Sequence, residues 1–159
     1  MLKKIKGFMK YDNRTKLLLL ETFFVLGWAR ILKRIPFAKV APFLGERSAE
    51  TPDYVNERNR SKLNEISKAI AIMSHHTPWE SRCLVQATAA MNMLKRRKIE
   101  STLYIGMAKE EHGALIAHAW LRSGSFYVTG SEGMERFTVV GTFANNVSNK
   151  RMKGEVNGS

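Results

Sequence analysis

The sequence has a single cysteine, Cys83, among 159 residues, so no intramolecular disulfide can form. Its four histidines and one cysteine also lack the ligand spacing of zinc sites. The sequence therefore predicts neither a disulfide scaffold nor a metal centre, and it shows no cofactor motif. Because a chain without disulfides suits a reducing compartment, we expect a cytoplasmic protein.

Long uninterrupted apolar runs are also absent. Four charged residues interrupt the apolar stretch 17–35. Its longest unbroken segment, 22–29, is far short of the roughly 20 residues that a membrane-spanning helix needs. No small-residue cleavage site follows, so the sequence does not predict a secretory signal peptide.

Acidic residues are scarce, with 14 Asp and Glu against 26 Lys and Arg, a formal net charge of +12. Within residues 1–47 there are 11 basic and 3 acidic side chains. Such a balance favours an acidic peptide, an anionic membrane surface or a nucleic acid as partner. The sequence shows neither a helix-turn-helix signature nor interleaved aromatic and basic residues, so we do not expect nucleic-acid binding.

Changes of composition divide the chain into three regions. Residues 1–50 form a basic, apolar N-terminal region, in which the pattern predicts a helix over 15–33. Residues 51–144 form the central domain. Residues 145–159 are rich in Asn, Lys and Gly, which is typical of a flexible tail.

Within the central domain the hydrophobic period changes from helical to strand-like. Helical spacing predicts one helix over 56–74 and a second that begins near Ser81 and ends in a basic run. Alternation then predicts strands, over 102–107, 116–121, 126–129 and 137–143. Helices followed by an antiparallel meander predict an α+β fold.

Cys83 lies in the first turn of the second predicted helix. Free amide groups and partial positive charge at a helix N-terminus favour the thiolate, and Arg82 adds a neighbouring cation. The same amides could stabilise the oxyanion of a tetrahedral intermediate. The alternative is that Cys83 is a small apolar core residue, which is the commoner role for a lone cysteine.

His118 lies inside a predicted strand. Alternation places His118 and Trp120 on one face and Ala117, Ala119 and Leu121 on the other. If the Cys83 helix packs on the His118 face, thiol and imidazole meet, as a Cys-His pair requires. The alternative is a structural histidine with satisfied hydrogen bonds.

Six segments between about Ser61 and Phe143 form a recognisable set: WESRCLVQA (79–87), LKRRKI (94–99), LYIG (103–106), AHAW (117–120), VTG (128–130) and FTVV (137–140). Together they resemble the transglutaminase-like cysteine proteases and, more narrowly, the leader peptidases of lasso-peptide biosynthesis. The resemblance implies a papain-like core of helices packed on an antiparallel sheet, with the N-terminal region as a helical extension.

The resemblance implies that Cys83 attacks the amide between the leader and core segments of a precursor peptide. His118 would be the general base and then the acid. It also implies two partners, a separate leader-recognition protein and an ATP-dependent cyclase that closes the macrolactam. The length of the chain matches the stand-alone form of these peptidases.

The family's third residue, usually an Asp on the next strand, has no counterpart here. A two-residue loop at Ser123-Gly124 would place Thr129 opposite His118, where its hydroxyl could accept a bond from the imidazole. Glu132 is the nearest alternative carboxylate. Thr129 could equally be an ordinary strand residue, and Glu132 a solvated turn charge. Trp79 and Trp120 are expected to wall the substrate cleft or simply to pack in the core.

Two other functions stay open. The same Cys-His pair could catalyse acyl transfer rather than hydrolysis, because fold alone does not decide the acceptor. The apolar N-terminal helix with its basic flanks could instead dock on a membrane surface or a partner protein, with or without catalysis.

Overall fold

The computed structural model describes Gly7, residues 9–54 and residues 56–147. Three long helices appear close to where the sequence predicts them, and Asp12 and Asn56 cap the first two with their side chains. The helical segments are α2 (Asn13–Leu32), α3 (Phe37–Val40), the 3-10 turn η1 (Ala41–Phe43), α4 (Glu57–Ser74), α5 (Cys83–Arg96) and the 3-10 turn η2 (Met134–Arg136).

In the described part of the chain, five antiparallel strands form one sheet in the order β1-β5-β2-β3-β4. They are β1 (Glu46–Arg47), β2 (Ser101–Lys109), β3 (Leu115–Ser123), β4 (Phe126–Thr129) and β5 (Thr138–Asn145). The predicted α+β class is confirmed, but a simple meander is wrong, because β5 returns to pair with β2 on the side away from β3. The short β1 lies in the segment after the N-terminal helices, where no strand was expected.

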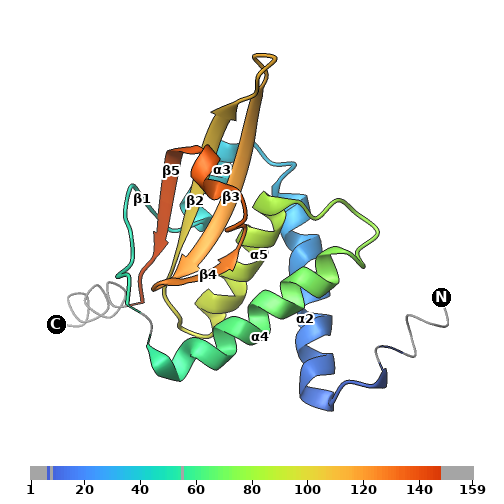
Figure 1. The fold of residues 1–159 in the computed structure, drawn as a ribbon. Helices are drawn as coiled ribbons and strands as arrows, with labels where there is room; N and C mark the ends of the chain where they lie inside the picture. The colour runs from blue at the N-terminus through green and yellow to red at the C-terminus, as the bar shows by residue number, and fades with distance from the viewer. Residues whose placement is uncertain (1–6, 8, 55, 148–159) are drawn as a thin grey trace.

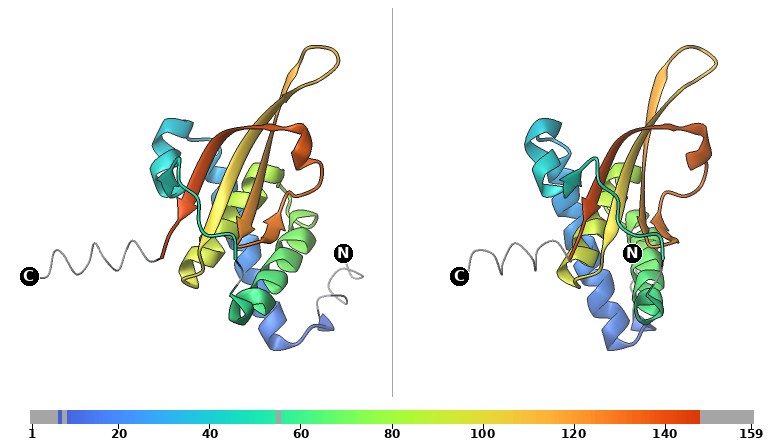
Figure 2. Two further views of the ribbon diagram at one scale, coloured as in Figure 1. Left: turned by 60° about the vertical axis from the view of Figure 1, so that its left-hand side comes forward. Right: turned by 90° about the vertical axis from the view of Figure 1, so that its left-hand side faces the viewer.

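The sheet and the long helices form three successive layers. Helices α4 and α5 pack on one face of the sheet, and α2 packs on α4 and α5 on the side away from the sheet (Figures 1 and 2). One apolar core runs through all of them, from Leu26 of α2 through Ile66 of α4 and Leu94 of α5 to Leu121 of β3. The β2–β3 hairpin extends beyond the helices (Figure 1).

Arg122 of β3 fastens the connection between β1 and α4 to the sheet. Its guanidinium donates hydrogen bonds to the carbonyl oxygens of Thr51 (3.0 Å) and Pro52 (3.2 Å), to the Glu50 carboxylate (3.0 Å) and to the Tyr104 hydroxyl (2.8 Å). Arg122 is buried. Arg122 therefore ties the chain that leads into α4 to the sheet, together with the hydrogen bonds between Thr51 and Thr102 of β2 at 2.9 and 2.7 Å.

The last region is described only in part. Asn145, its first residue, is buried at the end of β5 and pairs with Ser101. Residues 148–159 of the predicted flexible tail lie outside the described residues.

Candidate active site

Cys83 is the first residue of α5, as predicted. Arg82 stands at the N-cap in an extended conformation, and its carbonyl accepts the first helical hydrogen bond from the Gln86 amide at 3.0 Å. No side chain of the described residues caps this end of the helix. The half-buried thiol thus lies beside amide groups that are free to meet negative charge.

Side-chain hydrogen bonds fix the segment that precedes Cys83. The side-chain amide of Gln86 donates to the Ser81 carbonyl at 2.8 Å, and the Ser81 and Thr77 hydroxyls lie 2.9 Å apart. Thr77 also donates to the Trp79 carbonyl at 3.1 Å. These short bonds set the path of the chain into α5 and so the position of the thiol.

Arg82 does not act as a free cation beside the thiol. Its side chain points to solvent and forms an ion pair with Glu80. Because the Glu80 carboxylate neutralises the guanidinium, Arg82 stabilises a negative charge on Cys83 less than the sequence led us to expect. The helix N-terminus is left as the main positive group near the sulfur.

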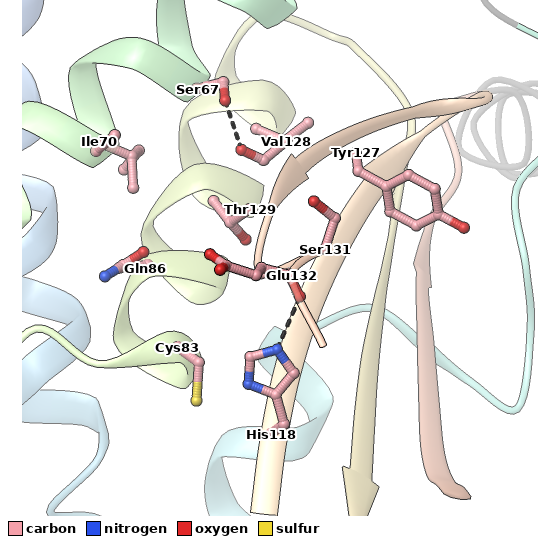
Figure 3. A pocket seen from close by; sticks show the side chains of 12 residues that line it. Ser67, Ile70, Cys83, Gln86, His118, Tyr127, Val128, Thr129, Ser131 and Glu132 are labelled. Carbon is pink, nitrogen blue, oxygen red and sulfur yellow. Dashed lines mark hydrogen bonds between the residues drawn. The ribbon is translucent and has the colours of Figure 1, made fainter. Parts of the chain in front are cut away.

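His118 of β3 is held by the main chain. Its Nε2 lies 2.7 Å from the carbonyl oxygen of Gly130, directly after β4. A carbonyl oxygen only accepts, so Nε2 carries the proton and Nδ1 has the lone pair of a neutral ring. Figure 3 shows the Cys83 sulfur and Nδ1 facing each other.

The imidazole reaches Cys83 by a different route from the one expected. Ala119 and Leu121 pack with α5 in the core, whereas the His118 ring stacks on Trp120 (5.8 Å between centroids). The condition that α5 pack on the His118 face is therefore not met. Pairing between β3 and β4 stops at Leu121, and Gly130, the residue after β4, accepts the hydrogen bond from the His118 ring. Cys83 and His118 line one cavity, where Figure 3 shows the sulfur and the ring facing each other.

Thr129 does not face His118. The pairing is Leu121 with Thr129 and Arg122 with Tyr127, with an irregularity between them, so the predicted register is wrong. The Thr129 hydroxyl is buried and has no hydrogen-bond partner among the described residues. Glu132 lines the same cleft, but no hydrogen bond joins it to His118 in the described part of the chain.

The two tryptophans lie behind the cleft rather than along it. Trp79 packs on Phe23 of α2 (5.0 Å between centroids) and against Gly27. Trp120 is buried between Tyr104 and His118. Neither lines the cavity that opens at Cys83, so Trp120 supports the His118 ring and Trp79 fastens the Cys83 loop to α2.

The cavity at Cys83 has a volume of about 470 Å³. It runs between α4, the start of α5 and the segment that follows β4, as Figure 3 shows. Cys83 and His118 stand at one end, and the remaining wall is largely polar, with Gln86, Ser131 and Glu132. An extended peptide is the kind of substrate that such a wall can hydrogen-bond along its length.

Comparison with known proteins identifies the family. A family model described as the transglutaminase-like superfamily matches residues 23–142. The match begins inside α2 and ends inside β5, so it includes both Cys83 and His118. No curated protein and no solved structure matches the chain.

Proposed function

This chain belongs to the transglutaminase-like superfamily, and we propose that it is a cysteine peptidase that removes the leader from a lasso-peptide precursor. One observation carries the enzymatic part: the thiol at the start of α5 faces the ring nitrogen of His118 that Gly130 leaves free. The choice of substrate rests on the sequence resemblance over Ser61 to Phe143.

The reaction begins with a proton transfer. Nδ1 of His118 takes the proton of the Cys83 thiol, while Nε2 keeps its own proton on the Gly130 carbonyl. The thiolate attacks the carbonyl carbon of the scissile amide, and the carbonyl electron pair moves to oxygen. The amides in the first turn of α5 are placed to stabilise that oxyanion.

Collapse of the intermediate breaks the carbon–nitrogen bond. Nδ1 gives its proton to the departing amine, which becomes the new N-terminus of the core peptide, and the leader stays on Cys83 as a thioester. A water molecule, deprotonated by Nδ1, then adds to the thioester. The products are a leader with a free carboxylate and the regenerated thiol.

The proposed peptidase acts with partners and without a cofactor of its own. A separate recognition protein presents the leader, and an ATP-dependent cyclase joins the freed amine to a carboxylate side chain of the core. The cleavage therefore supplies the cyclase with its nucleophile.

The test is mass spectrometry of a matching precursor peptide incubated with this protein and the recognition protein. Wild type should release a leader with a free carboxylate, and Cys83→Ala and His118→Ala should release none. His112→Ala is the matched histidine control, because His112 is exposed in the turn between β2 and β3. Full cleavage by Cys83→Ala would refute the mechanism.

The same spectra separate hydrolysis from acyl transfer. A leader joined to an added amine, in place of the free acid, would assign the Cys83–His118 pair to an acyltransferase. In that case Cys83 would still be the nucleophile, but the assignment as a peptidase would be refuted.

A further inference from the structure

The outer face of α2 carries an unbroken line of exposed apolar side chains. At helical spacing they are Leu17, Leu20, Phe24, Trp28 and Ile31, here called the α2 stripe. Leu17, Phe24 and Ile31 are 68%, 65% and 65% exposed. Large apolar side chains in solvent along four turns of one helix indicate a surface made to be covered.

The stripe is not the face that holds α2 to the protein. Leu19, Thr22, Leu26 and Ala29 are the buried residues of the opposite face, packed towards α4 and α5. Since α2 lies on the side of those helices away from the sheet (Figures 1 and 2), its outer face points away from the body of the molecule. The described residues leave the side chains of the stripe between 40% and 68% exposed.

A further aromatic side chain lies beside the stripe. Phe43 of η1 is 70% exposed and lines one small cavity together with Trp28. The apolar surface is thus wider at Trp28 and has two aromatic rings there. Tryptophan and phenylalanine are the side chains that favour the boundary between lipid tails and headgroups.

Positive charge surrounds the stripe. Lys10, Arg14 and Lys16 lie near its start, and Arg30 and Arg34 near its end, whereas Lys33 is paired with Glu80 at 4.0 Å. The one carboxylate within α2, Glu21, is occupied by Arg97 at 2.6 Å and Arg96 at 3.2 Å. An apolar stripe with basic edges complements a surface whose outer layer is negatively charged and whose interior is apolar.

We propose that the α2 stripe docks the protein on an anionic lipid bilayer, with α2 lying in the plane of the headgroups. Charge complementarity selects the bilayer as occupant. No described helix is long and apolar enough to cross one, so the contact is peripheral. The basic side chains meet lipid phosphates while the stripe enters the acyl boundary.

The experiment is co-sedimentation of the full chain with vesicles of phosphatidylcholine alone and of phosphatidylcholine with phosphatidylglycerol. Wild type should sediment with the anionic vesicles only. Raising the salt from about 0.1 M to about 1 M, which shortens the screening length from about 10 Å to about 3 Å, should weaken binding.

Two variants test the stripe and its edges. Phe24→Ser with Ile31→Ser removes apolar contact, and Lys16→Ala with Arg34→Ala removes charge; each should weaken binding by about tenfold or more. Their matched controls, Leu115→Ser with Val140→Ser and Lys109→Ala with Arg136→Ala, lie on exposed positions of the sheet side and should bind as wild type. Unchanged alkylation of Cys83 verifies folding.

Three outcomes would overturn the proposal. The first is no sedimentation with anionic vesicles, and the second is equal binding by the stripe variant and wild type. The third is a dimer in solution that Phe24→Ser with Ile31→Ser dissociates, which would assign the stripe to a second copy of the chain. None of these results bears on the Cys83 chemistry, because the stripe shares no residue with the catalytic cavity.

Discussion

Nε2 of His118 lies 2.7 Å from the main-chain oxygen of Gly130. A carbonyl oxygen that accepts from Nε2 fixes both the tautomer and the direction of the ring. The position that a carboxylate fills in related enzymes is thus filled here by the backbone.

We expect Gly130→Ala to lower kcat of leader removal by about 10-fold to 100-fold. Gly130 has φ +70°, and a methyl group there would stand 2.4 Å from the Ala119 carbonyl oxygen and 3.1 Å from Cα of Trp120. The backbone must move to relieve that contact, and the carbonyl that holds His118 moves with it. Steady-state cleavage assays measure the effect.

Gly133→Ala is the matched control. Gly133 has nearly the same backbone, φ +72°, but no atom lies within 4 Å of the added methyl group. In both variants the positive φ lowers the free energy of unfolding by about 1 kcal/mol. The difference in kcat between the two variants therefore reports the displaced carbonyl alone. Equal rates for the two variants would show that Gly130 does not position His118.

Thr129→Val should raise the free energy of unfolding by about 1 kcal/mol, because it replaces a buried hydroxyl that has no partner in the described structure. Since Thr129 lies opposite Leu121 rather than His118, we expect kcat to change by less than about threefold, well below the usual contribution of a general base or its support. Urea unfolding and cleavage assays measure the two effects. A large fall in kcat would restore Thr129 as a partner of the histidine.

Sequence reasoning placed Cys83 and His118 on their elements because both placements depend on local patterns, whereas the catalytic role of the pair rests on the family resemblance and stays a prediction. Helical spacing after residue 83 and alternation around residue 118 place each residue on its element, and the structure confirms both elements. The long helices and the α+β class follow from the same periodicities.

Sequence reasoning missed the Gly130 carbonyl because its position depends on two small displacements. The tight turn spans Gly124 and Ser125, one residue later than predicted, and an irregularity between Leu121 and Arg122 shifts the register again. Each displacement changes which residue faces His118. A backbone oxygen also has no residue type of its own, so only a glycine directly after a short strand could have pointed to it.

Arg122→Leu should lower the free energy of unfolding by about 3 kcal/mol. It leaves the carbonyl oxygens of Thr51 and Pro52 and the buried side of Tyr104 without their donor. In a chain of this length we expect the melting temperature to fall by about 10 °C. Arg58→Leu, at an exposed position of α4, should change stability by less than about 0.5 kcal/mol, and an equal loss in both would contradict the anchoring role.

Acid should weaken the contact between α2 and α5 through Glu21. Hydrogen bonds from Arg97, at 2.6 and 2.9 Å, hold the pKa of the Glu21 carboxyl below its usual 4.5, against the opposing effect of burial. A carboxyl whose pKa is lower in the folded state stabilises the fold above its unfolded pKa. That contribution is lost as the pH falls through the lowered folded value.

Glu21→Gln therefore should be less stable than wild type at pH 7, and the difference should shrink between about pH 5 and about pH 2. Urea unfolding at a series of pH values measures it. Arg97→Met should remove most of the same pH-dependent part, because Arg96 still lies 3.2 Å from Glu21. Adding it to Glu21→Gln should cost less than the sum of the two single changes, because the two residues share one interaction. A difference between wild type and Glu21→Gln that is constant across this pH range would mean that Arg97 does not lower the pKa of Glu21.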